Sequence, residues 1–173
     1  MGRIEPRKGL LDLLAAARLL VERLPGLRVV IVRGTAIEAD REYERRVLEM
    51  AEGMGRTVLV TGPEDDARRL MPWFDVLCVP SLREPFGTVA AEALAAGTPA
   101  VVTDSGGMPE YVTSGRSGEV VPPGDPDRLA QALERVLADA PAMADAARAD
   151  VARFGIARAA RETAALLDES TRR

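Results

Sequence analysis

Short apolar runs alternate with longer helix-forming stretches along nearly the whole chain, and this alternation limits the folds that the chain can adopt. A strand with one face in water alternates polar and apolar residues, whereas a strand buried on both faces is almost continuously apolar. The runs LRVVIV, TVLVT, VLCVP, PAVVT and GEVV are of the second kind. They predict strands at 27–32, 57–61, 76–80, 99–103 and 118–121, in a parallel sheet covered by helices on both faces.

The stretches between these runs predict helices. Residues 10–24 carry apolar side chains at helical spacing and end at Pro25-Gly26, which stops a helix. Helices are predicted at 10–24, 38–53, 66–71 and 88–96 and from 127 onward, with one or two helices from 142 to the end. We therefore expect one doubly wound, Rossmann-like α/β domain over residues 1–173, with ligands bound beyond the carboxyl ends of its strands.

Composition and charge exclude several classes of protein. With 23 basic and 27 acidic residues the net charge is −4, which argues against a general nucleic-acid binder or membrane-surface binder. No apolar run approaches the roughly 20 residues that cross a bilayer, so no membrane span is expected. The chain has no histidine, which excludes histidine-based catalysis within it. Its single cysteine, Cys78, is interpreted as an inert core thiol, and the lack of a disulfide framework favours a cytoplasmic location.

The segment SLREPFGTVAAEALAAG directly follows the predicted strand 76–80, at the place where such folds bind ligands. Pro85 and Gly87 interrupt any helix here, so we expect Glu84 in a loop and Glu92 in an early turn of the next helix. The open amide groups at the start of that helix suit a phosphate, and the two carboxylates suit sugar hydroxyls. Spacing alone also allows both acids to be solvated surface residues.

Motifs on both sides of this segment follow a characteristic order. Residues 75–125 resemble the C-terminal domain of retaining glycosyltransferases with two Rossmann-like halves, the GT-B fold of glycosyltransferase family 4. The E-x7-E signature of that family is matched by EPFGTVAAE, and GGMPE, GEVV and PPGD follow it. Upstream, Gly2-Arg3 and Lys8-Gly9 resemble the family's G-R-x4-K-G segment. The resemblance covers essentially the whole chain.

The resemblance implies a role for each matched position. Arg3 and Lys8 would neutralise the diphosphate of a nucleotide-sugar donor, whose charge increases as it leaves, so that no metal is expected. Glu84 would bind hydroxyls of the donor sugar, and Glu92 would bind the ribose hydroxyls. Five further positions would contact the donor through their backbone, three at the sugar and distal phosphate and two near the base: Phe86, Gly87, Thr88, Thr61 and Gly62.

Other residues near these motifs are interpreted as structural. Arg7 is expected to point away from the site. Asp65 and Asp66 superficially resemble a metal-binding pair, but their place after Gly-Pro favours capping of the next helix. Trp73 and Phe74 are expected in the core rather than as a platform for a sugar ring.

The chain departs from the family pattern in two respects. It contains neither the N-terminal half that binds the acceptor nor the histidine that this half contributes. Only Met1 precedes Gly2-Arg3, where the family has an apolar strand in the middle of the sheet, so the usual first strand is expected to be missing. The chain would then be a fragment, take this strand from a partner chain, or have a rearranged sheet. Exposed sheet edges would also favour a homodimer.

These features lead to a functional hypothesis. The chain is expected to be the donor-binding domain of a retaining glycosyltransferase that transfers a hexose from a nucleotide diphosphate sugar to an unknown acceptor. The isolated chain is expected to be nearly inactive, because the acceptor must be held in line with the donor. Two alternatives remain, namely a non-catalytic nucleotide-sugar-binding or assembly module acting only with a partner chain, and a nucleotide-sugar epimerase of the same fold.

Overall fold

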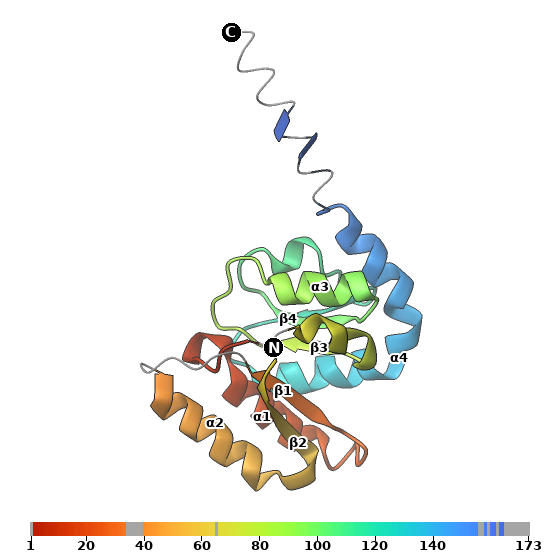
Figure 1. Ribbon diagram of the computed structural model, residues 1–173. Coiled ribbons are helices and arrows are strands. Elements are labelled where there is room, and N and C mark those ends of the chain that lie inside the picture. The colour runs from red at the N-terminus through yellow and green to blue at the C-terminus, as the bar shows by residue number, and fades with distance from the viewer. Residues whose placement is uncertain are drawn as a thin grey trace.

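The computed structural model describes residues 2–33, 40–64 and 66–155, together with positions 158, 160, 161, 163 and 164. Strands and helices alternate along this part of the chain (Figure 1). The strands are β1 (Val29–Arg33), β2 (Val58–Pro63), β3 (Leu77–Val79), β4 (Ala100–Thr103) and β5 (Gly118–Val121). The α-helices are α1 (Leu10–Leu20), α2 (Arg41–Gly53), α3 (Thr88–Ala96) and α4 (Pro126–Ala152). The short 3-10 helices are η1 (Pro6–Lys8), η3 (Gly55–Thr57), η4 (Ala67–Trp73) and η5 (Met108–Glu110).

The strands are all parallel and form two sheets. β1 pairs with β2, with Val29 opposite Val58, and the second sheet has the order β3-β4-β5. α2 packs against β2 and α1, α1 also packs against α4, and α3 and α4 pack against the second sheet (Figure 1). The predicted doubly wound α/β architecture is confirmed, although no strand of the described residues joins β1 to β3.

The core explains why the strand sequences are continuously apolar. All four residues of β4 are buried, and their side chains point alternately to opposite faces of the sheet. Ala100 and Val102 pack into a cluster that includes Leu94 of α3, whereas Val101 packs with Leu20 of α1. A polar residue at any of these positions would be buried against a helix, so both faces select apolar side chains.

Local interactions set the ends of several elements. α1 ends at Leu20, short of the predicted 24, and the chain then makes a turn in which the Arg23 and Leu24 amides both donate to the Leu20 carbonyl, at 3.0 and 2.8 Å. The predicted helix at 66–71 is instead the 3-10 helix η4. It contains Pro72, which has no backbone amide to donate to an α-helical hydrogen bond. Asp125 caps α4 by accepting a 2.9 Å hydrogen bond from the Arg128 amide. Of the predicted helix 38–53, residues 38 and 39 lie outside the described residues.

The prediction that Trp73 is a core residue is wrong. Its side chain is 84% exposed at the end of η4, whereas the neighbouring Phe74 is partly buried. The apolar run that follows begins only at Val76, so η4 ends before the chain enters the sheet and leaves the indole at the surface.

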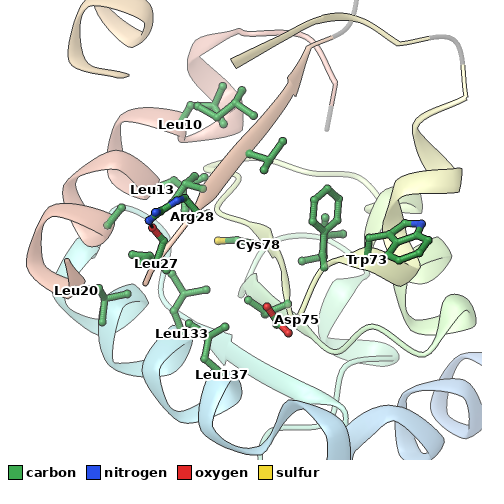
Figure 2. A pocket seen from close by; sticks show the side chains of 17 residues that line it. Leu10, Leu13, Leu20, Leu27, Arg28, Trp73, Asp75, Cys78, Leu133 and Leu137 are labelled. Atoms are coloured by element: carbon green, nitrogen blue, oxygen red, sulfur yellow. Dashed lines mark hydrogen bonds between the residues drawn. The ribbon is translucent and has the colours of Figure 1, made fainter. Parts of the chain in front are cut away.

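An apolar cavity of about 280 Å³ separates the two sheets (Figure 2). β1 contributes Val29, Val30 and Ile31 to one side, and β3 contributes Leu77 and Cys78 to the other. The cavity is therefore lined by residues of both sheets. Within the described part of the chain, no helix is both long and apolar enough to cross a membrane.

The different burial of two leucines of α1 predicts that replacing them with alanine will change the free energy of unfolding by very different amounts. Leu14 is fully buried with Ile31 and Val47, whereas Leu19 is 44% exposed on the same helix. We expect Leu14→Ala to lower the free energy of unfolding by about 2–5 kcal/mol, because it leaves a cavity. Leu19→Ala, the matched control, should change it by less than about 1 kcal/mol. Urea denaturation followed by circular dichroism measures both values, and equal losses would contradict the described packing of α1.

Candidate functional site

The site begins where residues 2–9 dock against the loop that follows β3. The carbonyl oxygen of Arg7 accepts hydrogen bonds from the amides of Leu82 and Arg83, at 2.8 and 3.3 Å. Gly9 has φ +62°, and a Cβ atom added there would overlap the carbonyl oxygen of Pro80. Only glycine tolerates both the backbone angle and this close approach. The two segments are therefore held together through their backbones, independently of charged side chains.

This docking brings Lys8 and Glu84 into contact. The Lys8 Nζ donates a 2.6 Å hydrogen bond to Glu84 Oε2, although the two residues are 76 positions apart in sequence. The Ser81 hydroxyl lies 3.3 Å from the same oxygen. The side chains of Lys8 and Glu84 are only 20% and 11% exposed, so water screens the pair weakly. The fold thus brings a cation and a carboxylate from two distant motifs into direct contact.

A second carboxylate, Glu5, organises the arginines around this pair. Arg7 lies 2.7 Å from Glu5 and also approaches Glu84 to 3.9 Å. The prediction that Arg7 points away from the site is therefore wrong: η1 places it beside Lys8 rather than outward. Arg3 lies 3.7 Å from Glu5 and is about half exposed. Glu5 itself is buried and anchors both arginines near the Lys8–Glu84 pair.

The backbone after Glu84 is held by the turn that follows β4. The Glu84 amide donates to the Ser105 hydroxyl at 2.9 Å, and the Gly107 amide donates to the Pro85 carbonyl at 3.0 Å. Gly106 has φ +61°, and a Cβ atom there would overlap the carbonyl oxygen of Glu84. The glycine pair of GGMPE therefore permits this close contact.

A buried tyrosine fixes the next two peptide groups. The Tyr111 hydroxyl lies 2.5 Å from the Phe86 carbonyl and 2.8 Å from the Gly87 carbonyl. Burial raises the pKa of Tyr111, and the negative charge of Glu84 raises it further, so the hydroxyl stays protonated and donates. The rings of Phe86, Tyr111 and Phe154 also pack together, with centroids 5.2 to 6.3 Å apart. The end of α4 thereby contacts the loop before α3.

The N-terminus of α3 opens next to Glu84. Gly87 caps the helix with φ +76°, and the Ala90 amide bonds to the Gly87 carbonyl at 2.8 Å. The amide groups just before Ala90 lie in the first turn of the helix. No preceding helical turn supplies carbonyl acceptors for them. Gly87 and Thr88 lie at this helix start, where amide groups can bind an anion, and Phe86 directly precedes it; their contact with a donor stays a prediction.

Glu92 lines a separate, polar cavity of about 290 Å³. Arg33, Glu64 and Arg68 also line it. The hydrogen bond and charge of Asp66 raise the pKa of Arg68, and the negative charge of Glu92 raises it further. A smaller hollow of about 30 Å³ is lined by Arg3, Lys8 and Ser81 among others. The two hollows share three lining residues, Gly2, Val32 and Val89. The two hollows therefore adjoin, and together we call them the trough, with Lys8 lining one part and Glu92 the other.

Two predicted base-binding residues, Thr61 and Gly62, lie at the end of β2 beside this trough rather than in its lining. The Thr61 hydroxyl donates to the Gly62 carbonyl at 2.8 Å and accepts from the Arg33 amide at 3.4 Å. Asp66 lines the cavity, occupies the position before η4 and pairs with Arg68, while Asp65 lies outside the described residues. Among the described residues, no group of three or more acids or cysteines could hold a metal ion.

Comparison with known proteins identifies the family of this chain. Residues 1–152 match the family described as glycosyl transferases group 1. The chain belongs to this family. It is 38% identical over 144 residues to the D-inositol 3-phosphate glycosyltransferase of Corynebacterium urealyticum, covering 80% of this chain and 34% of that protein. It is also 38% identical over 143 residues to the phosphatidyl-myo-inositol mannosyltransferase of Mycolicibacterium smegmatis, covering 80% of this chain and 35% of that protein.

A solved structure shows how this group 1 domain fits into a larger fold. The Anabaena protein HepE, solved in complex with UDP, superposes with a TM-score of 0.87 at 28% identity, over 97% of this chain and 48% of that one. The fold is that of the C-terminal half of a GT-B glycosyltransferase. The chain spans about a third of the length of the curated relatives above and about half of HepE.

Motif reading misses three residues that lie around the Lys8–Glu84 pair and the start of α3, namely Glu5, Arg7 and Tyr111. Arg7 and Glu5 form ion pairs that depend on the turn of η1, which the sequence does not specify. Tyr111 directly follows the GGMPE motif, and this position next to a glycine turn was the one available signal. The hydrogen bonds of the Tyr111 hydroxyl to residues 86 and 87 join segments far apart in sequence, so the spacing of residues does not predict them.

Alanine substitutions at two glycines with similar φ angles distinguish the stability cost of backbone strain from the cost of steric overlap. Gly106 has φ +61° and touches the Glu84 carbonyl, whereas Gly115 has φ +73° and open space around it. We expect Gly115→Ala to cost about 1–2 kcal/mol of unfolding free energy, for the left-handed conformation alone. Gly106→Ala should cost at least about 1 kcal/mol more, because the loop at Glu84 must also move. If chemical denaturation gives both variants the same loss of unfolding free energy, the close contact between Gly106 and the Glu84 carbonyl does not affect stability.

Proposed function

We propose that this chain is the donor-binding domain of a retaining, family 4 hexosyltransferase that uses a nucleotide diphosphate sugar. The observation that carries the proposal is the Lys8–Glu84 pair beside the open start of α3, at 2.6 Å and largely shielded from water. The pair would supply a cation for a diphosphate and, directly beside it, a carboxylate for sugar hydroxyls. Membership in the glycosyl transferases group 1 family and the fold shared with HepE, which was solved with UDP, support this choice.

The diphosphate would lie against Lys8, Arg3 and the amides of Phe86, Gly87 and Thr88. Negative charge grows on the diphosphate as the bond to the sugar breaks, and fixed cations and amide dipoles stabilise that charge more strongly than they stabilise the intact donor. Lys8 already has a carboxylate partner, so a bound diphosphate would share its three donors rather than replace Glu84. These cations provide the charge without a metal ion.

The sugar and the nucleoside would bind at opposite ends of the trough. Glu84 is an acceptor for sugar hydroxyls, held in place by Lys8 and Ser81. Glu92, in the polar cavity that Arg68 also lines, would accept hydrogen bonds from the ribose hydroxyls. The base would extend toward the end of β2, and we retain Thr61 and Gly62 as its proposed backbone contacts.

The acceptor site would be formed outside this domain. We propose that residues 1–173 act as one donor domain, and that transfer requires an acceptor domain in the same chain or in a partner chain. Donor and acceptor must be aligned for transfer, and alignment supplies a large part of the rate. The domain alone is therefore expected to bind nucleotides with little or no sugar transfer.

Isothermal titration calorimetry with UDP, GDP and ADP, alone and as sugar conjugates, tests this proposal directly. We expect at least one nucleotide to bind, and Glu92→Ala to weaken it by about tenfold or more, because a charged acceptor for the ribose is lost. Glu49→Ala, an acid exposed on α2 outside the trough, is the matched control and should leave affinity unchanged. A folded protein that binds no nucleotide, or a Glu92→Ala variant with wild-type affinity, would contradict the assignment.

A second series of variants distinguishes residues that bind the diphosphate from residues that bind the nucleoside. Lys8→Ala is expected to reduce affinity for the nucleoside diphosphate by about tenfold while leaving affinity for the nucleoside nearly unchanged, because only the diphosphate needs the cation. Lys8→Arg should recover part of the loss, and Arg18→Ala, at an exposed position of α1, should have no effect. If Lys8→Ala weakens both ligands equally, Lys8 supports the fold of the site rather than the diphosphate.

A further inference from the structure

We propose that Tyr111 is a positioning residue of the donor site, which holds the Phe86–Gly87 peptide group so that the Gly87 amide faces the diphosphate. The inference rests on the proposed function, in which that amide contacts the diphosphate. It adds a cause for the direction of the amide, namely a hydroxyl group buried on the opposite side of the peptide. Tyr111 is fully buried and would itself touch no part of the donor.

The Phe86–Gly87 peptide group depends on a side chain for its orientation. Among the described residues, the Phe86 carbonyl accepts a hydrogen bond only from the Tyr111 hydroxyl, at 2.5 Å. The carbonyls of Pro85 and Gly87, on either side, accept hydrogen bonds from backbone amides at 3.0 and 2.8 Å. The backbone therefore fixes the two neighbouring peptide groups, and the Tyr111 hydroxyl fixes the one between them.

Glycine at position 87 leaves this peptide group free to rotate. Gly87 has φ +76°, and a Cβ atom added there would lie only 2.9 Å from the Tyr111 hydroxyl oxygen and 2.5 Å from Met108 Cγ. Both the backbone angle and the packing thus favour glycine. Turning the peptide over changes φ of Gly87 and ψ of Phe86, and glycine accepts φ angles of either sign. The hydrogen bond to Tyr111 is the restraint that remains.

The carbonyl direction sets the amide direction. The described residues contain no cis peptide bond, and in a trans peptide the carbonyl and the following N–H point in opposite directions. The Phe86 carbonyl points to the buried Tyr111, so the Gly87 N–H points away from the core. Val89, in the same turn of α3, lines both hollows of the trough. A Gly87 N–H on this side can donate to an anion, whereas a turned-over peptide would present a carbonyl oxygen that repels it.

The ring and backbone of Tyr111 are held independently of its hydroxyl. The Tyr111 amide donates to the Met108 carbonyl at 3.2 Å. Its ring centroid lies 5.2 Å from that of Phe86 and 5.6 Å from that of Phe154. Phenylalanine at position 111 would keep these contacts and lose only the hydroxyl. The positioning role can therefore be separated from packing.

Tyr111→Phe tests the proposal, with Tyr43→Phe as its matched control. The Tyr43 hydroxyl also meets the backbone, accepting from the Leu11 amide at 3.3 Å, but Tyr43 lies on α2 and does not line the trough. Isothermal titration calorimetry gives the affinity of each protein for UDP, GDP, ADP and the three matching nucleosides. Nuclear magnetic resonance with carbonyl-13C phenylalanine and 15N glycine follows the peptide group itself. This labelling selects two amides, because Phe-Gly occurs in the sequence only at 86–87 and 154–155.

Tyr111→Phe is expected to weaken binding of the nucleoside diphosphate by about tenfold, because a donor to a charged group loses its fixed direction. Binding of the nucleoside should change by less than about twofold, since it does not need this amide. In the ligand-free protein the Gly87 signal should shift and broaden, or split, as the peptide samples two orientations. The Gly155 signal serves as the reference. Tyr43→Phe should leave the affinities and the Gly87 signal unchanged.

Equal weakening of diphosphate and nucleoside, or a Gly87 signal that Tyr111→Phe leaves unchanged, would overturn the proposal. So would a Tyr111→Phe protein that circular dichroism shows to be unfolded, because the hydroxyl would then maintain the fold as a whole. If the wild-type protein binds no nucleotide, the proposed function fails, and the role at the diphosphate fails with it. The Gly87 signal then decides separately whether Tyr111 orients the peptide.

Discussion

The docking of residues 2–9 onto the loop after β3 is the contact on which the site depends. It is made by the backbone, through the Arg7 carbonyl and the close approach of Gly9 to Pro80. Because of it, Lys8 and Glu84 meet at 2.6 Å with little exposure to water. Separated, they would be two ordinary solvated charges with weak mutual attraction. The glycine is therefore as necessary to the charge arrangement as the charged residues are.

A second constraint keeps the start of α3 in position. The Tyr111 hydroxyl holds the carbonyls of Phe86 and Gly87, and the turn at Gly106 supports the Glu84 carbonyl from the other side. These contacts come from segments beyond β4, and Phe154 at the end of α4 extends them through ring packing. An anion site made of backbone amides needs such external support, because peptide groups in an unsupported loop reorient freely.

The trough and the apolar cavity between the sheets are neighbours. The smaller hollow beside Lys8 and the cavity share Leu10, Ile31 and Cys78, and Gly2 both lines the trough and pairs with β1. Burial raises the pKa of the Cys78 thiol to about 12, so it remains a protonated, unreactive part of the wall, as the sequence predicts.

Local sequence determined the parallel strands, most of the helices and the placement of Glu84 in a loop and Glu92 on α3, because apolar periodicity, proline and glycine act over a few residues. The ordered motifs were sufficient to indicate the family. Tertiary structure decided the rest: that Arg7 turns inward to Glu5, that Trp73 is exposed, and that two sheets stand apart. These outcomes depend on which distant surfaces meet, and the direction of a side chain at such a contact is set by packing rather than by its neighbours in sequence.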